Sequence, residues 1–227
     1  MVLKKILYWL MVVCFPLLIV TSTIRVVLNS TQVYEYCIQK FDITSVTGID
    51  NQELHRIYQH WLNYYSSAVT SPQVQVVKKG GEIIDLLSQK EIIHLQDVKG
   101  LVQLNSAVQT TVLMFVLVCI GILKCRGKEW RLMIKAIFTG SLITMGIVLL
   151  LAVASFLGFD KLFTLFHQVS FSNQFWILDP TKDYLIMMFP EGFFFDVALF
   201  GLGMAALLST IFATLSYAGL RWTRDTV

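Results

Sequence analysis

Two histidines stand beside acidic residues in separate, largely apolar parts of the chain. His94 follows Glu91 by three residues and precedes Asp97 by three, so one face of a helix would carry all three side chains. An imidazole beside a carboxylate can be oriented by it, and it can exchange a proton near neutral pH. The pattern predicts acid–base chemistry, although an exposed histidine in an ordinary charged helix would give the same pattern.

The second histidine, His167, lies in an aromatic segment over about residues 160–196. Polar residues occur among its aromatic side chains, and those that could take part in chemistry include Asn173, Asp179, Asp183 and Glu191. An aromatic belt with Asn and Asp as turn formers would explain them. The other interpretation is a partly re-entrant loop, whose irregular backbone is covered by protein and whose ionisable groups are candidates for function.

Other catalytic patterns are weak or missing in the sequence. His55 and His60 are five residues apart, which does not place two metal ligands on one helix face, and HExxH, G-x-S-x-G, Walker A and CxxC motifs do not occur. Ser170 and Ser172 lie three and five residues after His167, which is weak support for a serine nucleophile. We therefore expect no metal and no other cofactor.

The composition and the long apolar stretches of the chain predict that these residues are held by the helices of an integral membrane protein. Of 227 residues, 56% are hydrophobic and 15% charged, whereas a soluble domain has about a quarter of its residues charged. Four stretches are long enough to cross a bilayer: about 6–24, 107–123, 136–159 and 197–220. This composition disfavours a soluble globule, a disulfide scaffold and a nucleic-acid binder.

The first stretch is expected to be an uncleaved anchor. It begins after the basic Lys4 and Lys5, as a signal peptide would, but it is longer than a usual signal core. Residues 21–25 also form a poor cleavage site.

Basic residues predict the orientation of the four spans. Lys and Arg gather at the N-terminus, in the loop over 124–135 and at the C-terminus, and such a side is cytoplasmic. Both termini are then inside, and segments 25–106 and 160–196 face outward. Of the four cysteines only Cys37 is external, so no intrachain disulfide is expected. We expect one integral membrane domain over residues 1–227.

The first external segment predicts a mainly helical cap that includes one short sheet. Asp50 and Glu53 have the spacing of a capping box. The amphipathic helix that follows has its apolar positions at Leu54, Ile57, Tyr58, Trp61, Leu62 and Tyr65. Residues 73–77 alternate like a strand, and residues 82–106 are expected to be helical and to run into the second span. The fold class is therefore an all-α membrane protein with four transmembrane helices.

Three motifs together resemble a known family. They are Glu91-x-x-His94-x-x-Asp97-Val98-Lys99, then Phe166-His167-x-x-x-Phe171-x-Asn173-x-x-Trp176-x-Leu178-Asp179-Pro180, and Phe189-Pro190-Glu191-x-Phe193-Phe194. In these motifs, and in length and span order, nearly the whole chain resembles the small integral membrane family of the lipoprotein intramolecular transacylase, Lit.

The resemblance implies a four-helix membrane enzyme of Gram-positive bacteria. Such an enzyme moves the sn-2 acyl chain of a diacylglyceryl-modified lipoprotein onto the α-amino group of the same N-terminal cysteine. Diacylated bacterial lipoproteins would be its substrate, membrane lipid would surround it, and no nucleic acid would take part. By position, His94 and His167 are implied as the reactive pair.

The residues fit this chemistry independently. An α-amino group titrates near ~8 and must be neutral to attack an ester, and a histidine can take its proton. We expect His167 as base and His94 as acid, with the reverse or shared assignment open. Asp97 is expected to orient His94, and the oxyanion donor is expected among Asn173, Lys99 and Arg25, although Arg25 could instead hold a lipid headgroup. The supporting candidates are Asp97, Lys99, Asn173, Arg25, Asp179 and Glu191.

Interpretations from other classes stay open. A serine acyl-enzyme lipid acyltransferase or esterase would use Ser170 or Ser172. A non-catalytic membrane partner subunit would use the aromatic loop as a docking surface. A metalloprotease would need a third ligand from Asp97, Asp183 or Glu191. A transporter is disfavoured because no span carries an interior charge.

Overall fold

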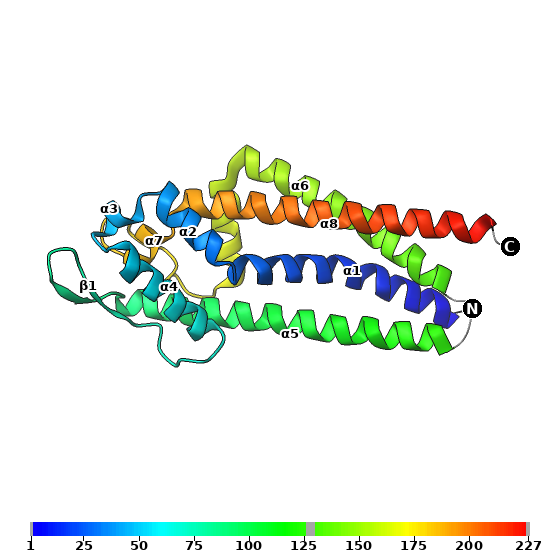
Figure 1. The fold of residues 1–227 in the computed structure, drawn as a ribbon, viewed down its shortest axis with the longest axis horizontal. Helices are drawn as coiled ribbons and strands as arrows, with labels where there is room; N and C mark the ends of the chain where they lie inside the picture. Colours follow the sequence, from blue (N-terminus) through cyan, green and yellow to red (C-terminus); the bar gives the residue numbers. More distant parts are fainter. Residues whose placement is uncertain (1, 126–129, 226–227) are drawn as a thin grey trace. The chain divides into compact units, whose positions relative to one another are not determined.

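The structure, a computed structural model, describes residues 2–125 and 130–225, and most of them are helical. The long helices are α1 (Val2–Leu28), α5 (Gln89–Cys125), α6 (Trp130–Ser170) and α8 (Glu191–Asp225) (Figure 1). The short elements are α2 (Thr31–Lys40), α3 (Ile43–Thr47), α4 (Asn51–Tyr65), β1 (Gln75–Val77), β2 (Ile83–Asp85) and α7 (Tyr184–Met188). Within the described residues, four helices are long and apolar enough to cross a membrane, which confirms the predicted fold class.

The long helices extend beyond the apolar stretches that predicted them. α5 begins at Gln89 and runs into the second span without a break, as expected. α6 continues to Ser170, and its helical geometry is interrupted at Gly158 (φ 174°, ψ 75°). Arg126 and Lys128, which contribute to the predicted orientation, lie outside the described residues. The orientation of the spans therefore stays a prediction.

The chain packs as two compact units. The first comprises the described residues of 1–26, 105–157 and 199–227, and the second comprises 27–104 and 158–198. In the first unit, segments of the four long helices run alongside one another (Figure 1). Helices pair their backbone polar groups within the segment, which suits them to cross a bilayer.

One close approach in the first unit depends on a glycine. A Cβ at Gly140 of α6 would lie 2.8 Å from the Cβ of Phe15 on α1. The hydroxyls of Tyr8 and Thr139 also hydrogen-bond at 2.9 Å across the same two helices. Small residues and polar contacts of this kind are typical of helix interfaces in membranes.

α4 supplies much of the core of the second unit. The side chain of Asp50 accepts a hydrogen bond from the Glu53 backbone N–H at 2.8 Å, which confirms the predicted helix start. The buried residues of α4 are Leu54, Ile57, Tyr58, Trp61 and Tyr64. Leu62 and Tyr65, also expected on the apolar face, are only partly buried. Tyr64 and Tyr65 are three and four residues after Trp61, and both positions lie on the same helix face as Trp61. The spacing therefore did not decide which of the two tyrosines is buried.

The short sheet of the second unit is a hairpin. The strand predicted over 73–77 is confirmed as β1, which pairs antiparallel with β2 through Val76 and Ile84. The prediction of helix from residue 82 is wrong for 82–88, because 83–85 form β2 and α5 begins only at Gln89. Gly81 adopts a positive φ of 80° and its N–H donates to the carbonyl of Lys78, so the chain turns back there.

The aromatic segment after α6 is irregular, as the loop prediction requires. Turns and bends occupy residues 171–183 before the single-turn helix α7. Phe171, Asp183 and Met188 are nevertheless buried. The segment is therefore packed into the second unit, and its depth in a membrane stays a prediction.

Candidate active site

The fold brings the two predicted histidines together in the second unit. His94 of α5 and His167 of α6 have ring centroids 5.9 Å apart and ring planes tilted by 33°. Each residue is only 7% exposed. Two imidazoles at this separation can act on neighbouring atoms of one substrate.

A backbone contact fixes the tautomer of His167. Its Nδ1 lies 2.7 Å from the carbonyl oxygen of Phe163, one turn earlier in α6. A carbonyl oxygen can only accept, so Nδ1 carries the hydrogen. In the neutral ring Nε2 then holds the lone pair, and Nε2 is the atom that can take a proton.

Aromatic rings surround His167. The indole of Trp176 lies at 5.0 Å between centroids with a tilt of 33°. The rings of Phe163, Phe166 and Phe171 lie at 4.3, 5.3 and 5.6 Å. These rings restrict the imidazole and keep water from most of its surface.

The hydrogen bonding of His94 differs from that of His167. Its Nδ1 is buried and has no hydrogen-bond partner within the described residues. The ring of Phe171 meets its imidazole edge-on at 5.1 Å. Because no described protein group holds Nδ1, the proton of His94 can occupy either ring nitrogen.

Asp97 and Asn173 meet beside the histidines. The side-chain amide Nδ2 of Asn173 donates to Oδ2 of Asp97 at 2.8 Å. The hydrogen bond of Asp97 within the described chain is thus to Asn173 and not to His94. The expectation that Asp97 orients His94 stays a prediction, since the described hydrogen bond of Asp97 goes to the neighbouring segment.

Glu91 has a structural role that the sequence interpretation missed. Its carboxylate is 1% exposed and accepts hydrogen bonds from the Ser88 N–H at 2.7 Å, the Ser88 hydroxyl at 2.8 Å and the Leu185 N–H at 2.7 Å. The Ser88-x-x-Glu91 spacing is a capping box that could have revealed the start of α5. The bond to Leu185 fastens α7 to the helix that carries His94.

A second buried carboxylate, Asp183, reinforces this connection. It is 8% exposed, and it accepts from the Asp179 N–H at 2.6 Å and from the Lys90 ammonium at 3.3 Å. Nothing local in the sequence distinguishes Asp183 from its exposed neighbours. Only the packed structure shows that it joins the loop to α5.

The structure places Asp179 in a turn. Its carboxylate accepts hydrogen bonds from the Thr181 N–H at 2.9 Å and the Thr181 hydroxyl at 2.7 Å. These bonds, with Lys182 nearby, hold the pKa of Asp179 below its ordinary value. Asp179 therefore remains a carboxylate at neutral pH and is not a proton donor there.

Three other predicted residues have surroundings of their own. The ammonium of Lys99 lies over the ring of Tyr64 at 4.1 Å, a cation–π contact. Glu191 is exposed in the first turn of α8, where a negative charge favours the helix. Arg25 belongs to the first unit and donates to the side-chain oxygen of Gln109 at 3.0 Å. The described hydrogen bonds thus join Asp97 to Asn173 beside the histidines, whereas Lys99 and Arg25 contact other side chains.

The described part of the chain shows no comparable arrangement for a serine nucleophile or a metal site. Neither Ser170 nor Ser172 hydrogen-bonds to His167, whose Nδ1 is taken by Phe163. Residues 2–125 and 130–225 contain no group of three or more His, Cys, Asp or Glu side chains placed to hold a metal ion. The thiol of Cys37 is fully buried and donates to the Met188 carbonyl at 3.3 Å.

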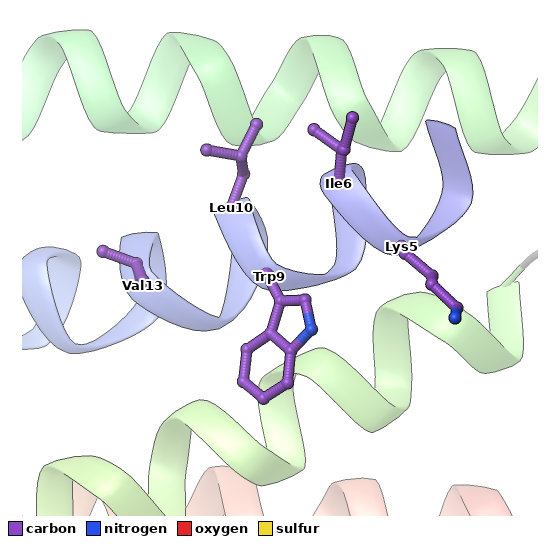
Figure 2. A pocket seen from close by; sticks show the side chains of 5 residues that line it. All are labelled: Lys5, Ile6, Trp9, Leu10 and Val13. Atoms are coloured by element: carbon purple, nitrogen blue, oxygen red, sulfur yellow. The ribbon is translucent and has the colours of Figure 1, made fainter. Parts of the chain in front are cut away.

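A hollow of about 430 Å³ lies along α1 in the first unit. Figure 2 shows that its lining side chains all come from α1, with Ile6 and Leu10 on one side of the helix and Trp9 on another. The remaining lining residues are Lys5 and Val13. Among the described residues that line it, Lys5 is the one ionisable group, so they form no acid–base pair.

Comparisons with known proteins show which family and which fold the chain resembles. The family model described as lipoprotein intramolecular transacylase Lit matches residues 9–194. The solved structure of the membrane-integral Lit of Bacillus cereus matches with a TM-score of 0.82 and 23% identity, over 99% of each chain.

Two further structures of the Bacillus cereus protein carry alanine or arginine in place of one histidine. The arginine variant matches with a TM-score of 0.77 and 22% identity, over 99% of this chain and 95% of that one. The alanine variant matches with a TM-score of 0.76 and 22% identity, over 98% and 96%. No curated protein matches. At these identities the structural matches support the fold.

Proposed function

Because the chain belongs to the Lit family of lipoprotein intramolecular transacylases, we propose that it moves the sn-2 acyl chain of a diacylglyceryl-cysteine to the α-amino group of that cysteine. The protein is a multi-pass membrane enzyme of acyl transfer. The product would be a lyso-form lipoprotein with one N-acyl and one O-acyl chain. The observation that carries this proposal is the buried imidazole pair, with centroids 5.9 Å apart.

His167 is proposed as the general base. The amine attacks the ester carbonyl carbon, a C–N bond forms, and the nitrogen must lose a proton. The lone pair on Nε2 of His167 takes that proton, since the Phe163 carbonyl occupies the other nitrogen. Proton transfer to a positioned histidine contributes typically about 10²- to 10⁴-fold to a rate.

His94 is proposed to return the proton to the leaving group. As the C–O bond breaks, the glyceryl oxygen leaves and must be protonated. Because its Nδ1 has no partner in the described chain, His94 can release a proton from one ring nitrogen to the leaving oxygen and take up at the other the proton that His167 received from the amine. The imidazole pair then ends each cycle with the protons it began with.

Alignment supplies the rest of the proposed catalysis. Donor ester and acceptor amine share one molecule, and holding them in a reactive geometry can contribute ~7–11 kcal/mol. No acyl-enzyme is needed, in keeping with the absence of a G-x-S-x-G motif.

The supporting roles are also proposals. Asp97 orients the pair, and an N–H donor among Asn173, Lys99 and Arg25 stabilises the oxyanion. Asp179 and Glu191 shape the segments around the site. Diacylated lipoproteins are the proposed substrates, met at the outer face of the membrane.

Mass spectrometry of a lipidated N-terminal peptide tests this function. The chain is expressed in a host without N-acylation, beside His94→Ala, His167→Ala and the matched control His55→Ala, whose imidazole is exposed and pairs with Glu35. We expect an N-acyl peptide with one O-acyl chain from the native chain and the control, and the diacyl free-amine peptide from the other two variants. An unchanged peptide from well-expressed native protein would refute the proposal.

A further inference from the structure

Asn173 forms one hydrogen bond from the loop after α6 to α5 and two within that loop. Its amide nitrogen donates to Asp97 at 2.8 Å. Its side-chain oxygen accepts from the Phe175 N–H at 3.0 Å, and its backbone carbonyl accepts from the indole Nε1 of Trp176 at 3.0 Å. One residue therefore fixes both the loop backbone and an aromatic side chain.

The aromatic side chain that hydrogen-bonds to Asn173 is one of the rings that pack against His167. The indole of Trp176 lies 5.0 Å from the imidazole of His167, with the two planes 33° apart. Asp97, which accepts the other hydrogen bond of Asn173, is one turn along α5 from His94. Asn173 is thus joined to the surroundings of both histidines.

We propose that Asn173 is a positioning residue that sets the two imidazoles relative to each other. Its bond to Asp97 locks the loop to the helix of His94, and its bond to Trp176 presses the indole against His167. The inference rests on the proposed acyl transfer. This positioning role differs from donation to the oxyanion. Positioning requires the hydrogen bond between Asn173 and Asp97, whereas oxyanion donation requires a side-chain N–H of Asn173 directed at the substrate.

A reciprocal exchange separates positioning from oxyanion donation. In Asn173→Asp two carboxylates face each other where the 2.8 Å bond was. Adding Asp97→Asn restores a donor and an acceptor with the roles reversed, and an aspartate at 173 still has an oxygen for the Phe175 N–H. The exchanged pair has no side-chain N–H at 173, so an oxyanion donor there would not be recovered.

Kinetics of the purified full chain in detergent, with a synthetic diacylated lipopeptide, give the readout. We expect Asn173→Asp to lower the rate at saturating substrate by about 10- to 100-fold, with little change in KM, because misplaced catalytic groups act on the chemical step. The double variant is expected to recover most of that rate. The matched control is Gln174→Glu, the same amide-to-acid change at the adjacent, exposed residue, which should leave the rate unchanged.

Trp176→Phe gives an independent test that keeps a ring against His167 but removes the indole N–H. It should lower the saturating rate while the thermal unfolding temperature stays near that of the native chain. Native activity in Asn173→Asp, or no recovery in a folded double variant, would overturn the inference and leave the function standing. A native chain that forms no N-acyl product would overturn the proposed function itself.

Discussion

Replacing Glu91 with alanine removes the acceptor of three hydrogen bonds at a buried position. The backbone N–H groups of Ser88 and Leu185 lose their partner, at 2.7 Å each, and Ser88 loses a contact of its hydroxyl at 2.8 Å. The hydroxyl can rotate toward another acceptor, but the two backbone donors cannot. We therefore expect the variant to be destabilised where α7 joins α5.

The size of the destabilisation follows from the two backbone N–H groups, of Ser88 and Leu185, that lose their acceptor. A buried donor without a partner costs about 1–3 kcal/mol, so two cost about 2–6 kcal/mol. For a chain of this length each kcal/mol lowers the unfolding temperature by about 2–4 °C. The Glu91→Ala variant should thus unfold at least about 4 °C below the native chain. Glu91→Gln keeps one accepting oxygen and should lose less.

Thermal unfolding in detergent micelles, followed by intrinsic tryptophan fluorescence, measures this difference. The matched control is Glu82→Ala, because the Glu82 side chain is 67% exposed and its ion pair with Lys78 is 4.0 Å long. Exposed pairs of this kind contribute little, so the control should unfold close to the native chain. A Glu91→Ala variant as stable as the control would refute the role assigned to this carboxylate.

Three further outcomes follow from the described geometry. Ser170→Ala and Ser172→Ala should retain N-acylation by mass spectrometry, because neither hydroxyl bonds to His167; loss of activity in a folded variant would favour the serine acyl-enzyme. Burial raises the pKa of the Cys37 thiol to about 12, so it is protonated at pH 8. Peptide mapping after iodoacetamide treatment at pH 8 should find Cys37 unmodified in folded protein and modified after denaturation, and equal labelling in both states would contradict its burial. Finally, excess EDTA should leave the rate of N-acyl formation unchanged, whereas loss of activity that added metal restores would point to a metal centre.

Local signals in the sequence predicted much of the fold. Apolar stretches of sufficient length gave the four long helices, and the Asp50–Glu53 spacing gave the start of α4. These features depend on residues close together in the chain, where periodicity and capping are informative.

The elements that the sequence did not predict depend on partners distant in the chain. β2 forms because Gly81 permits the turn and β1 is there to pair with, although residues 83–85 fit a helical interpretation. Tertiary contacts likewise decide that Glu91 binds Leu185 and that Asp97 binds Asn173. The two histidines were identified as candidates from their neighbours, but only the packing of α5 and α6 shows their separation.

The central claim, acyl transfer inside one substrate molecule by the imidazole pair, has a direct test in a crossover experiment. Purified protein is given an equal mixture of two diacylated lipopeptides, one isotopically labelled in both the peptide and the sn-2 acyl chain and the other unlabelled. The account predicts N-acyl products in which labelled peptide carries only labelled N-acyl chain and unlabelled peptide only unlabelled chain, with no product from His94→Ala or His167→Ala. Mixed products, labelled peptide bearing an unlabelled N-acyl chain, would contradict it and show that the acyl group leaves its own molecule on the way.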